Sequence, residues 1–171
     1  MSSLNFDEPR FPLSATARAT GWNLLTLRDY MARGKFEWHE TDSQAAAPGG
    51  RSLLSLRSVV RLGITFELWS IGVSPKDAYW AALNFGDVGH SKNRIGALPD
   101  RVPGHLFPDP YITYLVFKRA FLADVIAVKS GEQIDLESVM YDLFNDAPGA
   151  VAIVNVNRVW HRIMTALDVE A

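Results

Sequence analysis

The stretch LSATARATGWNLLTLRDYMARGKF, from Leu13 to Phe36, holds two helical segments separated by a glycine. The first segment, Leu13 to Thr20, is rich in alanine, and Ser14 is available as its N-cap. Gly21 then allows the backbone to turn where a side chain would obstruct it. Two short helices at this spacing either fill a core or form a helix-turn-helix that reads a nucleic acid.

The second segment, Leu24 to Arg33, has both its start and its end encoded in the sequence. Asn23 is a favourable N-cap, and Gly34 supplies the left-handed residue at which helices commonly end. The apolar positions three and four apart are Leu24, Leu27 and Met31. We therefore expect the helix to bury this stripe and to turn its other side outward. Trp22, in the turn, buries enough area to hold the two helices together.

The residues after these helices predict a hairpin. KFEWHE, residues 35–40, alternates apolar and polar side chains as a strand does, and SLLSL, residues 52–56, returns as its partner across a polar loop. A long helix then begins after the N-cap Ser55. Another helix begins at Pro75 with Ser74 as its N-cap, because proline is favoured at the first position of a helix.

A Gly/Pro-rich segment, residues 85–110, divides the chain into two predicted units, residues 11–84 and 111–171. In the second unit, strands are expected at residues 111–118, 123–129 and 150–156, and helices at residues 135–146, capped by Asp135, and 157–167. The order strand, strand, helix, strand, helix is typical of a small α/β or α+β sandwich. The whole chain is therefore expected to adopt an α+β fold.

Composition narrows the classes of protein. The chain has 171 residues, of which 48% are hydrophobic, enough for a core, and it contains no cysteine, which excludes disulfides and thiolate metal sites. The sequence shows neither a signal peptide nor a window of about 18 apolar residues, so we expect a cytoplasmic protein that makes no use of a membrane. The four histidines are scattered, and no catalytic, metal-binding or cofactor-binding constellation is recognisable, so an enzyme is not expected.

Charge is spread unevenly along the chain, whose formal net charge is −2. Residues 11–64 contain seven basic and four acidic side chains, a difference of +3, whereas residues 86–171 contain eight basic and eleven acidic side chains, a difference of −3. Because a basic surface attracts phosphate, the N-terminal half is the part that we expect to meet a nucleic acid.

The order of these elements resembles the winged helix-turn-helix domain of the MerR family of transcription regulators. The stretches that carry the resemblance are SATARATGWNLLTLRDYMARGKF with its T-L-R-x-Y core (Thr26, Leu27, Arg28, Tyr30), GGRSLLSLRSVVRL and LWSIGVSPKDAYWAA. The resemblance covers about Phe11 to Leu83. It implies a DNA-binding regulator that places the helix at residues 24–33 in the major groove and a wing, residues 35–55, on the flanking backbone. With few basic residues in one domain, a homodimer that presents two such helices is expected.

The candidates for contacts with double-stranded DNA are Arg18, Asn23, Thr26, Arg28, Tyr30, Lys35 and Arg51. By the resemblance, Arg28 contacts a backbone phosphate. Tyr30 either donates a hydrogen bond from its hydroxyl to a phosphate or covers the edge of the core. Thr26 is a candidate for a contact with a base or a phosphate. Arg18 and Asn23 lie at the turn between the helices, where a helix N-terminus favours anions. Lys35 and Arg51, on the predicted wing, would flank the minor groove or adjacent phosphates.

Departures from the family leave other functions open. Asp29 stands where the family has an aromatic residue, and an acid there is repelled by phosphate unless it faces away or pairs with Arg33 one turn later. A winged-helix adaptor that no longer reads DNA is therefore an alternative. The long coiled-coil helix of the family is also missing, so the C-terminal unit is expected to dimerise, dock a protein or bind a ligand. Aromatic side chains that would line a ligand pocket there are Tyr111, Tyr114, Phe117, Phe121 and Trp160.

Overall fold

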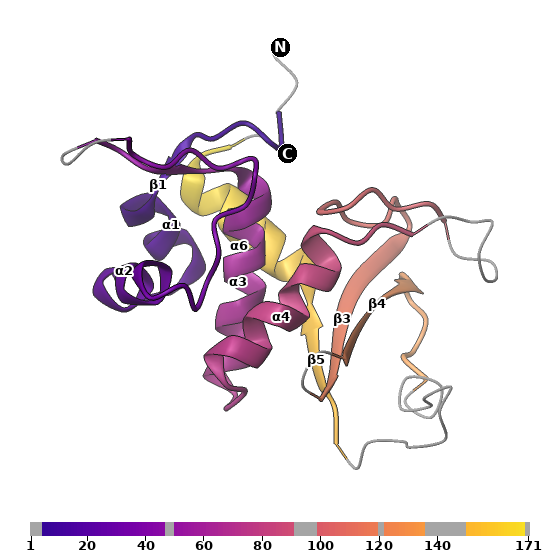
Figure 1. Ribbon diagram of the computed structural model, residues 1–171. Helices are drawn as coiled ribbons and strands as arrows, with labels where there is room; N and C mark the ends of the chain where they lie inside the picture. Colours follow the sequence, from indigo (N-terminus) through magenta and orange to yellow (C-terminus); the bar gives the residue numbers. More distant parts are fainter. Residues whose placement is uncertain (1–4, 47–49, 91–98, 120–121, 136–149, 170–171) are drawn as a thin grey trace.

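The computed structural model describes residues 5–46, 50–90, 99–119, 122–135 and 150–169. These residues form five helices and two small antiparallel sheets (Figure 1), so the predicted α+β fold is confirmed. None of the described helices combines the length and the apolar character needed to cross a membrane. The predicted helix at residues 135–146 lies, beyond its first residue, outside the described residues, as does Phe121.

The opening stretch folds into α1, Leu13–Thr20, and α2, Leu24–Ala32. Gly21 has φ of 94°, and its N–H donates to the last turn of α1, which ends there as predicted. Asn23 caps α2 by accepting two backbone N–H groups with its side-chain oxygen, and Gly34 follows the helix with φ of 65°. The sequence therefore encodes both ends of α2.

The predicted strand at residues 35–40 is not formed. Phe36 is fully buried, and the backbone of Glu37 is held by side chains instead of by a second strand. The N–H of Glu37 donates to Tyr79 Oη at 3.0 Å, and its carbonyl accepts from Tyr79 Oη at 2.7 Å and from Arg61 Nη2 at 3.2 Å. A strand partner would need the same backbone groups, so the long-range side-chain contacts replace the hairpin.

The first sheet therefore has a different strand pair from the predicted one. β2, Leu53–Leu54, pairs antiparallel with β1, Phe11–Pro12, which directly precedes α1. Ser43 makes a single antiparallel bridge to Leu53, so the chain between these two residues still forms a loop that returns on itself. Figure 1 shows the described parts of this loop, residues 43–46 and 50–53, projecting beside β1.

Two further helices follow. α3, Leu56–Ser70, and α4, Pro75–Gly86, begin after the predicted N-caps Ser55 and Ser74, each of which accepts a backbone N–H with its hydroxyl. α3 runs through the middle of the molecule, between α1 and α4 (Figure 1). Gly63 lies where α3 packs against the helix at residues 156–167: a Cβ atom there would come within 2.7 Å of the side chain of Ile163.

The second sheet has the order β4-β3-β5. It consists of β3, Tyr111–Arg119, flanked by antiparallel β4, Leu122–Lys129, and β5, Ala152–Asn155. α6, Val156–Leu167, follows β5 directly because Asn155, the last residue of the strand, is also the helix N-cap. The three strands and this helix were predicted, with ends that differ by a few residues.

A single core joins the two predicted units. Its largest fully buried side chains are Phe36, Phe85, Leu27, Leu54, Leu56, Ile64, Leu68, Leu115 and Ile163. Arg101, from the predicted linker, is also buried, and its guanidinium donates to backbone carbonyls of Phe85 and His105 at 3.0 and 3.2 Å. Burial lowers the pKa of Arg101 to about 10. The described part of residues 85–110 therefore contributes to the packed interior.

Candidate nucleic-acid interface

An aromatic cluster fixes the pair α1–α2 on α3. Trp22 is buried, and its Nε1 donates to the carbonyl of Leu62, in the middle of α3, at 2.9 Å. Its ring stacks on Trp69 with 4.8 Å between centroids, and three further aromatic rings make T-shaped contacts with it. Trp22 was predicted to hold the two helices to each other; the structure shows that it also attaches their turn to α3.

α2 buries one side and turns the other to solvent. Leu27 and Met31, on the predicted apolar stripe, are buried, whereas Leu25 is 72% exposed and Arg28 is exposed. Asp29 forms an ion pair with Arg33, at 2.7 Å between carboxylate and guanidinium. The sequence left two arrangements open for Asp29, which would either face away from DNA or pair with Arg33 one turn later. The structure has the pair, so the guanidinium of Arg33 neutralises the carboxylate of Asp29.

A groove of about 580 Å³ lies between the start of α1 and the loop that returns to β2. It is lined by Pro12, Leu13, Ser14, Arg28, Gly50, Arg51 and Ser52. The groove brings together two of the predicted DNA contacts, Arg28 from α2 and Arg51 from the loop, both exposed. No other predicted contact lines it.

The start of α1 adds to the positive potential of this groove. The N-cap position of α1 is Pro12, which offers no side-chain hydrogen bond, so the prediction that Ser14 caps the helix is wrong. The first turn of α1 contains no acidic residue. The N–H groups at a helix start carry a partial positive charge and attract anions, as guanidinium groups do. The groove is therefore suited to a phosphate oxygen.

Several other candidates have partners within the fold. The side-chain oxygen of Asn23 is occupied by the N–H groups of Leu25 and Thr26, at 2.9 and 3.3 Å. Tyr30 belongs to the aromatic cluster, and Lys35 Nζ lies 4.6 Å from the centroid of the Tyr30 ring. These contacts give each of the three residues a structural role, whatever else they contact.

The remaining candidate on α1, Arg18, is exposed in the last turn of that helix. Ser14 and Ser52, which line the groove, were not among the candidates. Ser52 reaches α1 only because Leu53 pairs with Pro12, and a two-residue strand has no periodicity from which that pairing could be read.

Asp42, at the base of the loop, forms hydrogen bonds with other residues of the fold. Asp42 Oδ1 accepts from the N–H and the hydroxyl of Ser55, at 2.8 and 3.0 Å. Asp42 Oδ2 accepts from the hydroxyl of Ser58 and the N–H of His39, both at 2.8 Å. These four bonds hold the loop on the start of α3 and use the acceptor capacity of the carboxylate.

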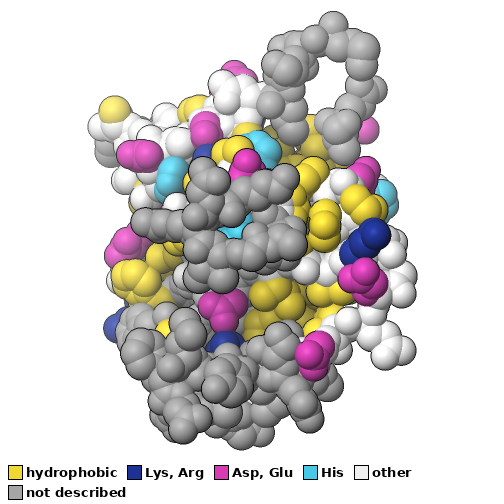
Figure 2. Space-filling view, turned by 90° about the vertical axis from the view of Figure 1, so that its right-hand side faces the viewer, with side chains coloured by type: hydrophobic (Ala, Val, Ile, Leu, Met, Phe, Trp, Pro, Cys, Tyr) yellow, Lys and Arg dark blue, Asp and Glu magenta, His cyan; other side chains and the backbone are white. Residues whose placement is uncertain are grey.

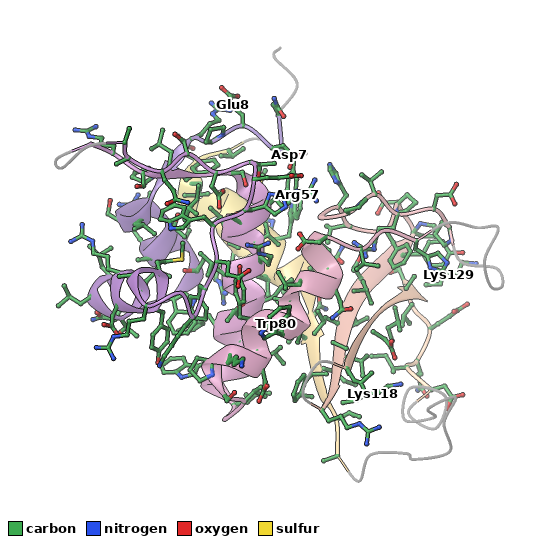
Figure 3. The ribbon with its side chains drawn as sticks, viewed as in Figure 1. Asp7, Glu8, Arg57, Trp80, Lys118 and Lys129 are labelled. Atoms are coloured by element: carbon green, nitrogen blue, oxygen red, sulfur yellow. The ribbon has the colours of Figure 1, made fainter. Side chains whose placement is uncertain are left out.

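Two basic residues of the N-terminal half also serve the fold. Arg57 forms an ion pair with Asp7 at 2.7 Å (Figure 3), and the hydrogen bond from Arg57 is the main cause that lowers the pKa of Asp7. Arg61 is buried and donates to Tyr79 Oη at 2.7 Å. Burial raises the pKa of the Tyr79 hydroxyl. Of the basic residues in this half, those on α1, α2 and the loop remain on the surface.

The opposite side of the molecule has a different character. Figure 2 views the side of β4, where the described basic side chains occur singly among acidic ones and beside hydrophobic patches. The described basic residues on this face are not clustered, so the groove at α1 is the better candidate for the binding site of an anionic partner.

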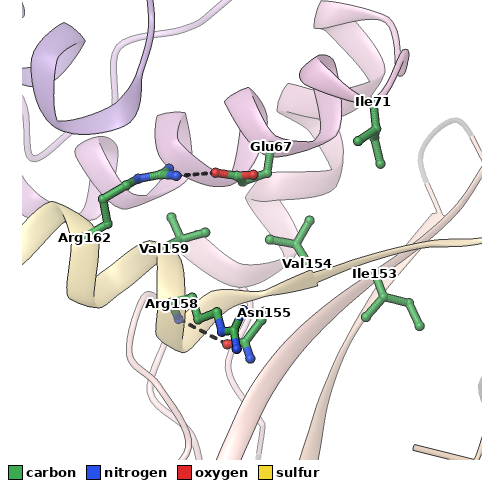
Figure 4. A pocket seen from close by; sticks show the side chains of 8 residues that line it. All are labelled: Glu67, Ile71, Ile153, Val154, Asn155, Arg158, Val159 and Arg162. Carbon is green, nitrogen blue, oxygen red and sulfur yellow. Dashed lines mark hydrogen bonds and ion pairs between the residues drawn. The ribbon is translucent and has the colours of Figure 1, made fainter.

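A second hollow, of about 270 Å³, lies between α3, β5 and α6 (Figure 4). The lining residues are Glu67, Ile71, Ile153, Val154, Asn155, Arg158, Val159 and Arg162, with Glu67 and Arg162 paired at 2.5 Å. None of the aromatic residues predicted to line a ligand pocket is among them. Trp160 instead stacks on Phe6, and Phe117 packs against the core beside another depression.

Within the described residues, no group of three or more His, Asp or Glu side chains is placed to hold a metal ion. Neither the models of known protein families nor the curated proteins give a match to this chain. What it binds must therefore be inferred from its own geometry.

Proposed function

We propose that the chain is a cytoplasmic transcription regulator that binds double-stranded DNA with a MerR-like winged helix-turn-helix, residues 11–84. The observation that carries the proposal is the meeting of Arg28 and Arg51 in one groove at the start of α1. Guanidinium groups make strong, charge-assisted hydrogen bonds to phosphate. Contacts of this kind set the position and the affinity of a protein on a duplex.

In this proposal α2 lies in the major groove. Its exposed residues, Leu25, Arg28 and Ala32, recur every three or four positions and so form one continuous side. The loop between Ser43 and Leu53 contacts the flanking backbone through Arg51. The pairing of Asp29 with Arg33 supports this orientation because it reduces the repulsion between the carboxylate and DNA.

One domain with so few surface arginines binds weakly, because each neutralised phosphate adds to the salt-dependent affinity. We therefore propose that the protein acts as a homodimer, with two α2 helices in successive half-sites. The C-terminal sheet and α6 supply the dimer contact in place of a coiled coil.

The test is a mobility-shift titration of the full chain on a duplex over a series of salt concentrations. The association constant is expected to fall linearly with salt on logarithmic axes, and the slope per chain to decrease by about 2 in the double variant Arg28→Ala, Arg51→Ala. Lys76→Ala, which changes an exposed basic residue on α4, away from the groove and from the proposed dimer contact, is the matched control and should leave the slope unchanged. Failure to bind any duplex at low salt would rule the proposal out.

A second candidate is a protein-interaction adaptor with the same fold. The exposed apolar residue Leu25 is the observation that favours it, because solvent-facing leucines also occur where a protein partner docks. Duplex binding that depends on Arg28 and Arg51 would exclude this candidate.

A further inference from the structure

Leu25 is the most exposed large hydrophobic side chain among the described residues, at 72%. It lies in the first turn of α2 and on the same side as Arg28, which is three residues further along. Exposing so much of a leucine forgoes the free energy that its burial would provide. A site that keeps an isolated apolar group beside a groove lined by two arginines calls for an explanation.

The fold does not require this side chain. Asn23 caps α2 through the backbone N–H of Leu25, which any residue except proline would provide. The packing of α2 rests on Leu27 and Met31, which point to the other side. The leucine is therefore available to a partner, and its chemistry limits what that partner presents.

We propose that Leu25 selects thymine, by packing against the C5-methyl group that thymine displays in the major groove. This inference rests on the proposed function. The N-terminal residues of a recognition helix are those that approach base edges. Leucine has no donor or acceptor, so the polar edge of any other base would lose solvent without gaining a hydrogen bond. Thymine alone offers an apolar group there.

The arginine groove fixes where this thymine lies. Arg28 is one turn from Leu25, and together with Arg51 it holds a backbone phosphate, so the register of α2 on the duplex is set beside the leucine. The expected site thus has one thymine, in each half-site, next to the clamped phosphate.

The experiment begins with selection from a randomised duplex library by the wild-type chain and by Leu25→Ala. Each thymine of the selected site is then replaced singly by deoxyuridine, which removes only the methyl group. In each half-site, one replacement is expected to weaken wild-type binding by about fourfold, the value for burying one methyl group, and to leave Leu25→Ala unaffected. Val102→Ala, at a residue 60% exposed and outside α2, is the matched control and should behave as wild type.

The two levels of the proposal fail in different ways. A wild-type chain that enriches a sequence, but whose thymine preference survives unchanged in Leu25→Ala, overturns the role of Leu25 and leaves DNA binding intact. A wild-type chain that binds no duplex overturns both. Because Leu25 is exposed and alanine is a better helix former, the variant is expected to melt at the wild-type temperature, which a thermal scan checks.

Discussion

The indole N–H of Trp22 donates to the backbone carbonyl of Leu62, joining the turn between α1 and α2 to the centre of α3. This single bond crosses 40 positions of sequence and places the exposed side of α2 relative to the rest of the molecule. The orientation of α2 thus depends on a residue in its preceding turn as well as on its own apolar stripe.

Replacing this anchor should destabilise the whole chain. Trp22→Phe keeps most of the aromatic packing but loses the hydrogen bond, so we expect the free energy of unfolding to fall by about 1–2 kcal/mol. Trp22→Ala should cost about 3–5 kcal/mol because it also leaves a cavity. Urea denaturation measures both values. Trp80→Phe, at a partly exposed residue, is the control, and a loss as large as that of Trp22→Phe would contradict the anchoring role.

Gly21 and Gly34 separate two effects of adding a side chain. Both have positive φ, 94° and 65°, so alanine should cost about 1 kcal/mol of backbone strain at either position. A Cβ atom at Gly21 would also lie 2.7 Å from the ring of Phe66, whereas no atom lies within 4 Å of one at Gly34. We expect Gly21→Ala to be less stable than Gly34→Ala by about 1–3 kcal/mol, measured by thermal melting. Equal losses would show that the ring of Phe66 moves away freely.

The pair Asp29–Arg33 predicts opposite effects of two substitutions on DNA binding. Asp29→Asn removes a negative charge near the duplex and should strengthen binding by about threefold at low salt. Arg33→Ala leaves the carboxylate uncompensated and should weaken binding by a similar factor. Because the pair is exposed, neither should change stability by more than about 0.5 kcal/mol. Weaker binding by Asp29→Asn, in the same mobility-shift assay, would instead mean that the carboxylate contacts a base.

Because of Tyr79, the free energy of unfolding is expected to fall as the pH becomes alkaline. Burial raises its pKa above the ordinary value of 10.0, so in the unfolded chain the hydroxyl ionises first. Its stabilising contribution is present below pH 10 and is lost as the pH rises through the folded pKa. Tyr79→Phe should cost about 1–3 kcal/mol at neutral pH, because Arg61 and the backbone of Glu37 lose their partner.

Tyr79→Phe has no hydroxyl to ionise, so its free energy of unfolding does not include the loss that wild type undergoes at alkaline pH. The difference in the free energy of unfolding between wild type and Tyr79→Phe should therefore narrow above pH 10. Urea denaturation at neutral pH and at two alkaline values measures this difference. A gap that stays constant would show that the hydroxyl of Tyr79 ionises equally in both states.

Local features of the fold could be predicted from the sequence because they depend on neighbouring residues. Asn23, Ser55 and Ser74 cap their helices by bonds to N–H groups two or three residues away, and the Asp29–Arg33 pair spans one turn. The same holds for the strands of the second sheet, whose β-branched and aromatic residues indicate them directly.

Distant contacts could not be predicted in this way. KFEWHE has the alternation of a strand, but Tyr79 and Arg61 occupy the backbone of Glu37 from 42 and 24 residues away. Arg101 stands in a segment whose glycines and prolines indicate a linker, yet its guanidinium is buried against backbone carbonyls. The groove was missed as a whole, since its lining residues come from three separate parts of the sequence.

The close contact between Gly63 and Ile163 bears on how the protein is made. α6 comes after α4 and the second sheet in the sequence and packs against α3, so α3 stays partly uncovered until the ribosome has added the residues up to Leu167. α1 and α2 leave the ribosome before α6 does, so the packing that supports them is completed only after they have been made. A nascent chain halted midway would therefore carry the residues of the groove without the fold that aligns them.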